Sequence, residues 1–274
     1  MQFNADFQIE WNTFFGNQGA ESGVMDVKLG RSGGGNGRKA YLTGLTSVEV
    51  LPTFIGLDVY QAPGSTGFYQ PNYGGGMRDA YFAVLDLDAH RLQYSTHWGG
   101  SGDDYGIALE VLKNPPHGDP YIWVGGLSKS TNLGTTQLPA PPVGGVHETT
   151  NAGDADALLL CFSGGDDVDL LYGTLYGGSG SDAVLDLAGG DACDDGGGNC
   201  MLYATGETRS GSGIILAEND AQFRREGADH VNGALAATAR PAYRLAIHPQ
   251  AAFQGTDHPS HPTAERCLEL LRVE

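Results

Sequence analysis

The chain of 274 residues is long enough for one or two domains with a substantial core, and its 43 glycines punctuate short apolar runs. A formal net charge of −18 argues against a nucleic-acid partner, because such binding needs a basic surface that displaces counterions from phosphate. No apolar run reaches the roughly 20 residues that a membrane helix requires, and the N-terminus lacks the basic and then apolar pattern of a signal peptide.

The first predicted elements are short strands separated by glycine-rich turns. An aromatic residue followed by glycine occurs in "NTFFGN" at 12–17, and a strand closing on glycine is expected in "AYLTGLT" at 40–46. The segment "RSGGGNGRK" at 31–39 is expected to join two strands, and it carries no phosphate-binding pattern. A further strand, "DAYFAVLD", is predicted at 79–86.

The stretch that follows has the clearest strand pattern of the chain. In "RLQYSTHW", Leu92, Tyr94, Thr96 and Trp98 share one face of the predicted strand, since side chains alternate. After it come the turn "GGSGDD" at 99–104, strands "YGIALEVL" at 105–112 and "PYIWVGGLS" at 120–128, a connector at 129–155, and the strand "DALLLCFS" at 156–163. Four short strands and a long connector, repeated, are typical of a β-propeller blade.

Three motifs recur with a period near 80 residues and in the same order. Phe15, Trp98 and Tyr176 each precede glycine and are separated by 83 and 78 residues. The strand-closing glycines at 44, 126 and 206 are separated by 82 and 80, and the two Asp-Ala strands by 77. The period predicts an all-β fold of about three propeller-like units, each with four antiparallel strands.

These motifs resemble the bacterial beta-propeller repeat (SBBP) family, in which Asp-Ala-Phe-Val, Leu-x-Tyr-Ser-Thr, Leu-Gly-Gly-Ser-Gly-x-Asp, Gly-Ile-Ala-Val and Tyr-x-Thr-Gly-x-Thr follow in order. The matching segments are "DAYFAVLD", "LQYSTHWGGSGDDYGIALEV" and "YIWVGGLSKSTNLGTT", and the resemblance covers about residues 9–210. It implies a propeller in secreted or surface-attached bacterial proteins, with no catalytic residues to transfer. The chain departs from the pattern at Ser181, which stands where the preceding copy has Asp103.

Two regions are predicted from where the pattern fades. Residues 1–210 form the propeller repeat region, and 211–274 form a degenerate last blade with a C-terminal tail that has helical spacing at 262–273. Within the second region, "NDAQF" at 219–223 is a candidate remnant of the Asp-Ala strand. Because a closed propeller needs at least four blades, we expect a partial ring or one completed by oligomerisation.

The repeated turn predicts a structural corner. Gly99, Gly100 and Gly102 are expected to reverse the chain between strands with positive φ. Asp103 and Asp104 are expected to cap freed backbone N–H groups, with an acid/base dyad as the alternative. The aromatic residues before the turns, Trp98 and Tyr176, are expected to pack between neighbouring sheets.

The loop "GGDACDDGGGNC" carries the candidate ligands and the candidate disulfide. Oxygen ligands from Asp191, Asp194, Asp195 and Asn199 suit calcium, and a solvated hairpin loop is the alternative. A bond between Cys193 and Cys200 across a hairpin would indicate an oxidising compartment. The remaining strand cysteine, Cys161, is predicted to be buried.

The late histidines and the aromatic loops offer further candidates. His258 and His261 in "DHPSHP" are candidate metal ligands, with an exposed polar segment as the alternative. The loops at 51–77 and 129–153 carry aromatics that would dock sugars or peptides, or else cover sheet edges.

The leading prediction for function is a non-enzymatic extracellular or cell-surface scaffold that binds protein or glycan partners or assembles with itself. A carbohydrate-binding adhesin or lectin, with or without calcium, is the first alternative. A propeller-based hydrolase or lyase is the second. Neither nucleic-acid binding nor membrane insertion is expected.

Overall fold

The computed structural model describes residues 1–15, 21–31, 37–47, 49, 51, 67–112, 119–140, 148–165, 168–189 and 202–210, and the backbone of 242–247. This part of the chain is all-β, as predicted, and every strand pair is antiparallel. Within the described ranges there is no helix capable of crossing a lipid bilayer.

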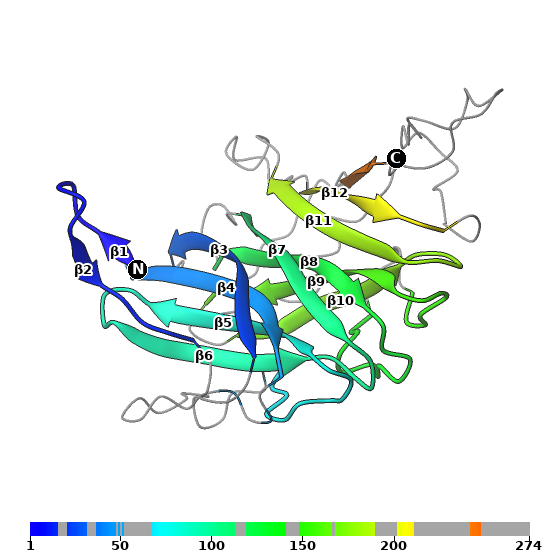
Figure 1. Ribbon diagram of the computed structural model, residues 1–274. Helices are drawn as coiled ribbons and strands as arrows, with labels where there is room; N and C mark the ends of the chain where they lie inside the picture. The colour runs from blue at the N-terminus through cyan, green and yellow to red at the C-terminus, as the bar shows by residue number, and fades with distance from the viewer. Residues whose placement is uncertain are drawn as a thin grey trace, which may run out of the picture.

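The strands form one hairpin and three sheets, each sheet a simple up-and-down succession (Figure 1). The hairpin is β1 (Gln2–Phe3) with β2 (Ile9–Trp11). The first sheet contains β3 (Ser22–Arg31), β4 (Arg38–Thr46), β5 (Asp79–Asp86) and β6 (Arg91–Trp98). The second contains β7 (Asp104–Leu112), β8 (Tyr121–Ser128), β9 (Asp156–Ser163) and β10 (Leu170–Tyr176). The third contains β11 (Asp182–Gly189), β12 (Leu202–Thr208) and β13 (Ala242–Ile247).

The first two strands of the three sheets repeat one pairing pattern. Ser22 pairs with Thr46, Asp104 with Ser128 and Asp182 with Thr208. Two residues later each ladder reaches the glycine that recurs in the sequence, Gly44, Gly126 or Gly206, and a β-bulge then inserts one extra residue in the first strand. The residues of β3, β7 and β11 can therefore be compared position by position.

A glycine on the second strand is required at this bulge. A Cβ on Gly44, Gly126 or Gly206 would overlap the backbone carbonyl of Gly23, Tyr105 or Ala183 on the adjacent strand. These glycines recur in the sequence because any side chain at this position would overlap the adjacent strand.

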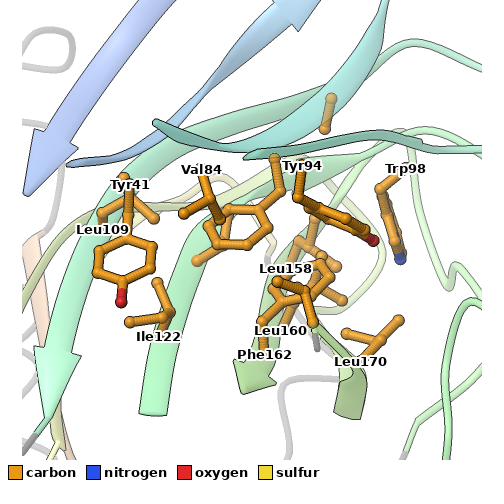
Figure 2. Close-up of a cluster of buried hydrophobic side chains, with 14 of the residues drawn as sticks. Tyr41, Val84, Tyr94, Trp98, Leu109, Ile122, Leu158, Leu160, Phe162 and Leu170 are labelled. Atoms are coloured by element: carbon orange, nitrogen blue, oxygen red, sulfur yellow. The ribbon is translucent and has the colours of Figure 1, made fainter. Parts of the chain in front are cut away.

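Neighbouring sheets are held together by apolar cores between them. Figure 2 shows the core between the first and second sheets, where Tyr41, Val84 and Tyr94 face Ile122, Leu160 and other second-sheet residues. Trp98 is buried in this core, and its indole N–H donates to the carbonyl of Gln137 at 2.9 Å. A second core joins Trp123 and Tyr172 to Leu187 of the third sheet, with Tyr176 packed against it. The predicted inter-sheet positions of Trp98 and Tyr176 are confirmed.

The sequence unit drawn from Asp79 does not coincide with a sheet. Strand β6 pairs with β5 and β7 pairs with β8, so the segment Gly99–Asp103 passes from one sheet to the next. The prediction of a reversal between strands of one unit was therefore wrong. Periodicity alone sets the length of a repeat but leaves open where a repeat begins.

The ends of the repeat region differ from the two complete sheets. The N-terminal segment contributes the β1–β2 hairpin, and its Trp11 and Phe15 pack on the first sheet, where Phe15 stacks on Tyr81. At the other end, β13 pairs with β12 and supplies the third strand of the third sheet. The candidate remnant at 219–223 and the predicted helix at 262–273 lie outside the described residues.

Candidate functional site

The repeated turn forms a buried corner organised by one carboxylate. Asp104, at the start of β7, is fully buried. Its Oδ2 accepts hydrogen bonds from the Gly100 N–H at 2.9 Å and from the Ser130 hydroxyl at 2.6 Å. Its Oδ1 accepts one from the Ser128 hydroxyl. The acid thus ties together the end of the first sheet, the start of the second and the loop after β8.

The third sheet begins with a copy of this corner. Asp182 Oδ2 accepts hydrogen bonds from the Gly178 N–H at 2.9 Å and from the Ser210 hydroxyl at 2.6 Å. Gly180 donates its N–H to the same Ser210 hydroxyl, as Gly102 does to Ser130. The expected capping role of the acids is confirmed here, and Asp103 adds to it by accepting the Met77 N–H.

Close approach, and not positive φ, explains the corner glycines. The glycines with positive φ in the described part of the chain are Gly75 and Gly76, so the prediction of positive φ at Gly99, Gly100 and Gly102 was wrong. A Cβ on Gly102 would lie 2.5 Å from the Lys129 carbonyl oxygen. Side chains are excluded because two backbone segments touch there.

Each corner brings a second buried acid beside the first. A Cβ on Gly99 would lie 2.6 Å from Asp104 Oδ2 and 2.9 Å from Asp79 Oδ1, so the two carboxyl groups flank the same glycine. At Gly177 the flanking atoms are Asp156 Oδ1 and Asp182 Oδ2. A pair of acids recurs because Asp79 and Asp156 both begin the third strand of a sheet.

The second acid of each pair has an oxygen without a hydrogen-bond donor. Asp79 Oδ2 accepts the Gly74 N–H, and Asp156 Oδ2 accepts the Ala152 N–H. The Oδ1 atoms of both side chains are buried and have no partner. Burial, reinforced by the negative charges of Asp104 and Asp103, raises the pKa of Asp79 to about 7. Burial likewise raises the pKa of Asp156.

These acids are suited to structure more than to catalysis. Asp104 and Asp182 lie inside the protein, and their polar contacts go to backbone and hydroxyl groups of the corner itself. Asp103 accepts the Met77 N–H and is ion-paired with Lys129. A cavity of about 10 Å³, room for about one water molecule, lies elsewhere, beside Tyr69, Gln70 and Ser95. The acid/base alternative for Asp103 and Asp104 therefore gains no geometric support from the described residues.

Most of the other predicted site residues fall outside the described ranges. These are Asp191, Asp194, Asp195, Asn199, Cys193, Cys200, His258 and His261, so the calcium loop, the Cys193–Cys200 bond and the histidine site stay predictions. Across the described residues, no three His, Cys, Asp or Glu side chains converge as metal ligands. Cys161 is buried in β9, as predicted, and is disulfide-bonded.

The long loops cover sheet edges where they are described. Phe68 packs against the first inter-sheet core, and its carbonyl accepts the Tyr94 hydroxyl. Leu138 is fully buried in the same core. Tyr69 remains exposed on the loop surface. This arrangement favours the covering role over a docking role for these segments.

An exposed apolar surface lies on β3, and sequence reasoning missed it. Val27 of β3 is 52% exposed, whereas the matching residues Leu109 of β7 and Leu187 of β11 are 0% and 3% exposed. Val24 is 47% exposed, whereas its match Val184 is 6% exposed. The difference arises because β7 and β11 each lie under the preceding sheet, and no sheet precedes β3 in the described structure. We call Val24, Val27 and Leu29 the open face.

The rest of that side of the first sheet is covered. Leu42, Ala83 and Leu92 are buried there beneath Trp11 and Phe15 of the N-terminal segment. Among the described strands of that side, β3 is the one left bare, so the open face is a strip along the edge strand of the first sheet. A register comparison of β3 with β7 would have found it in the sequence, but the segment 22–31 shows none of the repeat motifs that marked the other strands.

No family model matches the chain, and no curated protein matches it. The resemblance to the bacterial propeller repeats therefore rests on the motifs alone.

Proposed function

We propose that the chain is a non-enzymatic β-propeller-type scaffold that binds a protein partner through the open face. Three sheets with one strand order, one register and one bulge position, packed face to face through apolar cores, support a blade-like arrangement. The observation that carries the interaction role is the exposure of Val24 and Val27 at positions that are buried under a neighbouring sheet elsewhere in the same chain.

An extracellular or cell-surface location goes with this proposal. A disulfide at Cys161 supports an oxidising compartment, because disulfides persist there and are rare in the cytosol. The high negative charge keeps a scaffold of exposed sheet edges soluble.

The proposal is tested by placing a photo-crosslinking amino acid at Val27 in the full chain, expressed in its source cells, with the same amino acid at exposed Asp6 as the control. We expect a protein adduct of defined mass from position 27 that position 6 does not give. Identical adducts from both positions would contradict the interaction role. Chelator-sensitive binding on a glycan array would instead establish the lectin alternative.

A further inference from the structure

At one position in each contact between neighbouring sheets, a glycine on one sheet lies against a larger side chain on the other. Gly106 of β7 lies against Thr43 of the first sheet, and a Cβ on Gly106 would overlap the Thr43 hydroxyl. At the next junction the sizes are reversed, since Val184 of β11 lies against Gly125, and a Cβ on Gly125 would overlap the valine methyl. One glycine stands at each contact, which lets the two sheets approach closely.

The same position can be located on the two outer sheets of the described structure, the first and the third. Gly106 and Val184 match Val24 of β3, because each pairs with the strand glycine before the bulge. Thr43 and Gly125 match Thr205 of β12, because each pairs with the residue after the bulge. The open face thus presents valine, and the third sheet presents threonine.

We propose that the open face accepts a further sheet of this repeat type whose second strand carries glycine opposite Val24, and that it rejects the third sheet of a second copy. Valine against threonine would place two branched side chains where each internal junction has room for one. The sequence "WVGG" at 123–126 illustrates the partner's pattern, since its Gly125 receives Val184. This inference rests on the proposed interaction role and names the partner.

Two single substitutions test whether one glycine at this position allows two copies of the chain to pack together. Thr205→Gly reproduces the junction of Gly125 with Val184, and Val24→Gly reproduces that of Gly106 with Thr43. Met25→Gly is the matched control, because it removes apolar surface from the same strand at the bulge and leaves the contact position unchanged. Each full-length variant is checked for folding by circular dichroism and then studied by analytical ultracentrifugation.

We expect the unmodified chain and Met25→Gly to remain monomeric, while Thr205→Gly and Val24→Gly each self-associate roughly tenfold more tightly or better. Adding Val27→Asp to either variant should abolish the association. If the unmodified chain associates as tightly as the variants and Val27→Asp reverses it, the glycine rule is wrong and the interaction role stands. If no variant associates, the rule is wrong, and crosslinking at Val27 then decides whether the interaction role falls with it.

Discussion

The buried acid Asp79 makes a sharp prediction about stability and pH. Its pKa in the folded chain is about 7, against 3.8 for an ordinary aspartate. The folded state therefore holds a proton that the unfolded state has released across this interval, so the contribution of this group is full below pH 4 and is lost as the pH rises through 7. A change of about three pKa units corresponds to at most about 4 kcal/mol, and we expect about 2–4 kcal/mol.

Asp79→Asn should remove this dependence. An asparagine amide keeps an acceptor for the Gly74 N–H and places a neutral donor beside Asp104, as the protonated acid does. We expect the variant to match the unmodified chain in free energy of unfolding at pH 3, where Asp79 is protonated in both states, and to exceed it by about 2–4 kcal/mol at pH 8. Urea unfolding followed by tryptophan fluorescence at several pH values measures the difference.

Asp6→Asn is the control, because it removes a carboxylate from an exposed position. A difference in free energy of unfolding between Asp79→Asn and the unmodified chain that stayed constant from pH 3 to pH 8 would refute the raised pKa of Asp79. It would also be refuted if the variant were the less stable of the two at pH 8, since Asp79 would then be ionised in the folded chain and stabilised by its charge.

Three further substitutions test the packing. Trp98→Ala should cost about 3–5 kcal/mol of unfolding free energy in chemical denaturation, because a fully buried ring and its hydrogen bond are lost; a cost below 1 kcal/mol would contradict its place in the core. Gly126→Ala should lower the melting temperature strongly in calorimetry, since its Cβ would strike the Tyr105 carbonyl, whereas Gly134→Ala should be nearly neutral. Ser130→Ala should cost about 1–3 kcal/mol by removing a donor to buried Asp104, and an unchanged unfolding midpoint would show that the corner does not depend on it.

The sequence by itself determined the all-β class, the period near 80 residues and the roles of several single residues. Alternation in 91–98 predicts a strand because side chains alternate about an extended backbone. The regular spacing of Gly44, Gly126 and Gly206 arises because the backbone at each bulge leaves no room for a side chain. Such features depend on residues close in the chain or on a pattern that is repeated, so they can be predicted from the sequence alone.

Only the tertiary structure decided where a sheet begins and which surfaces remain open. The boundary at Gly99–Asp103 follows from pairing between distant strands, and repetition alone is the same whichever strand is counted first. The meeting of Asp79 with Asp104, and the exposure of Val27 where Leu109 is buried, depend on what packs across from each residue. Whether a residue is buried depends on its neighbours in space, so residues at matching positions of the repeat can be buried in one sheet and exposed in another.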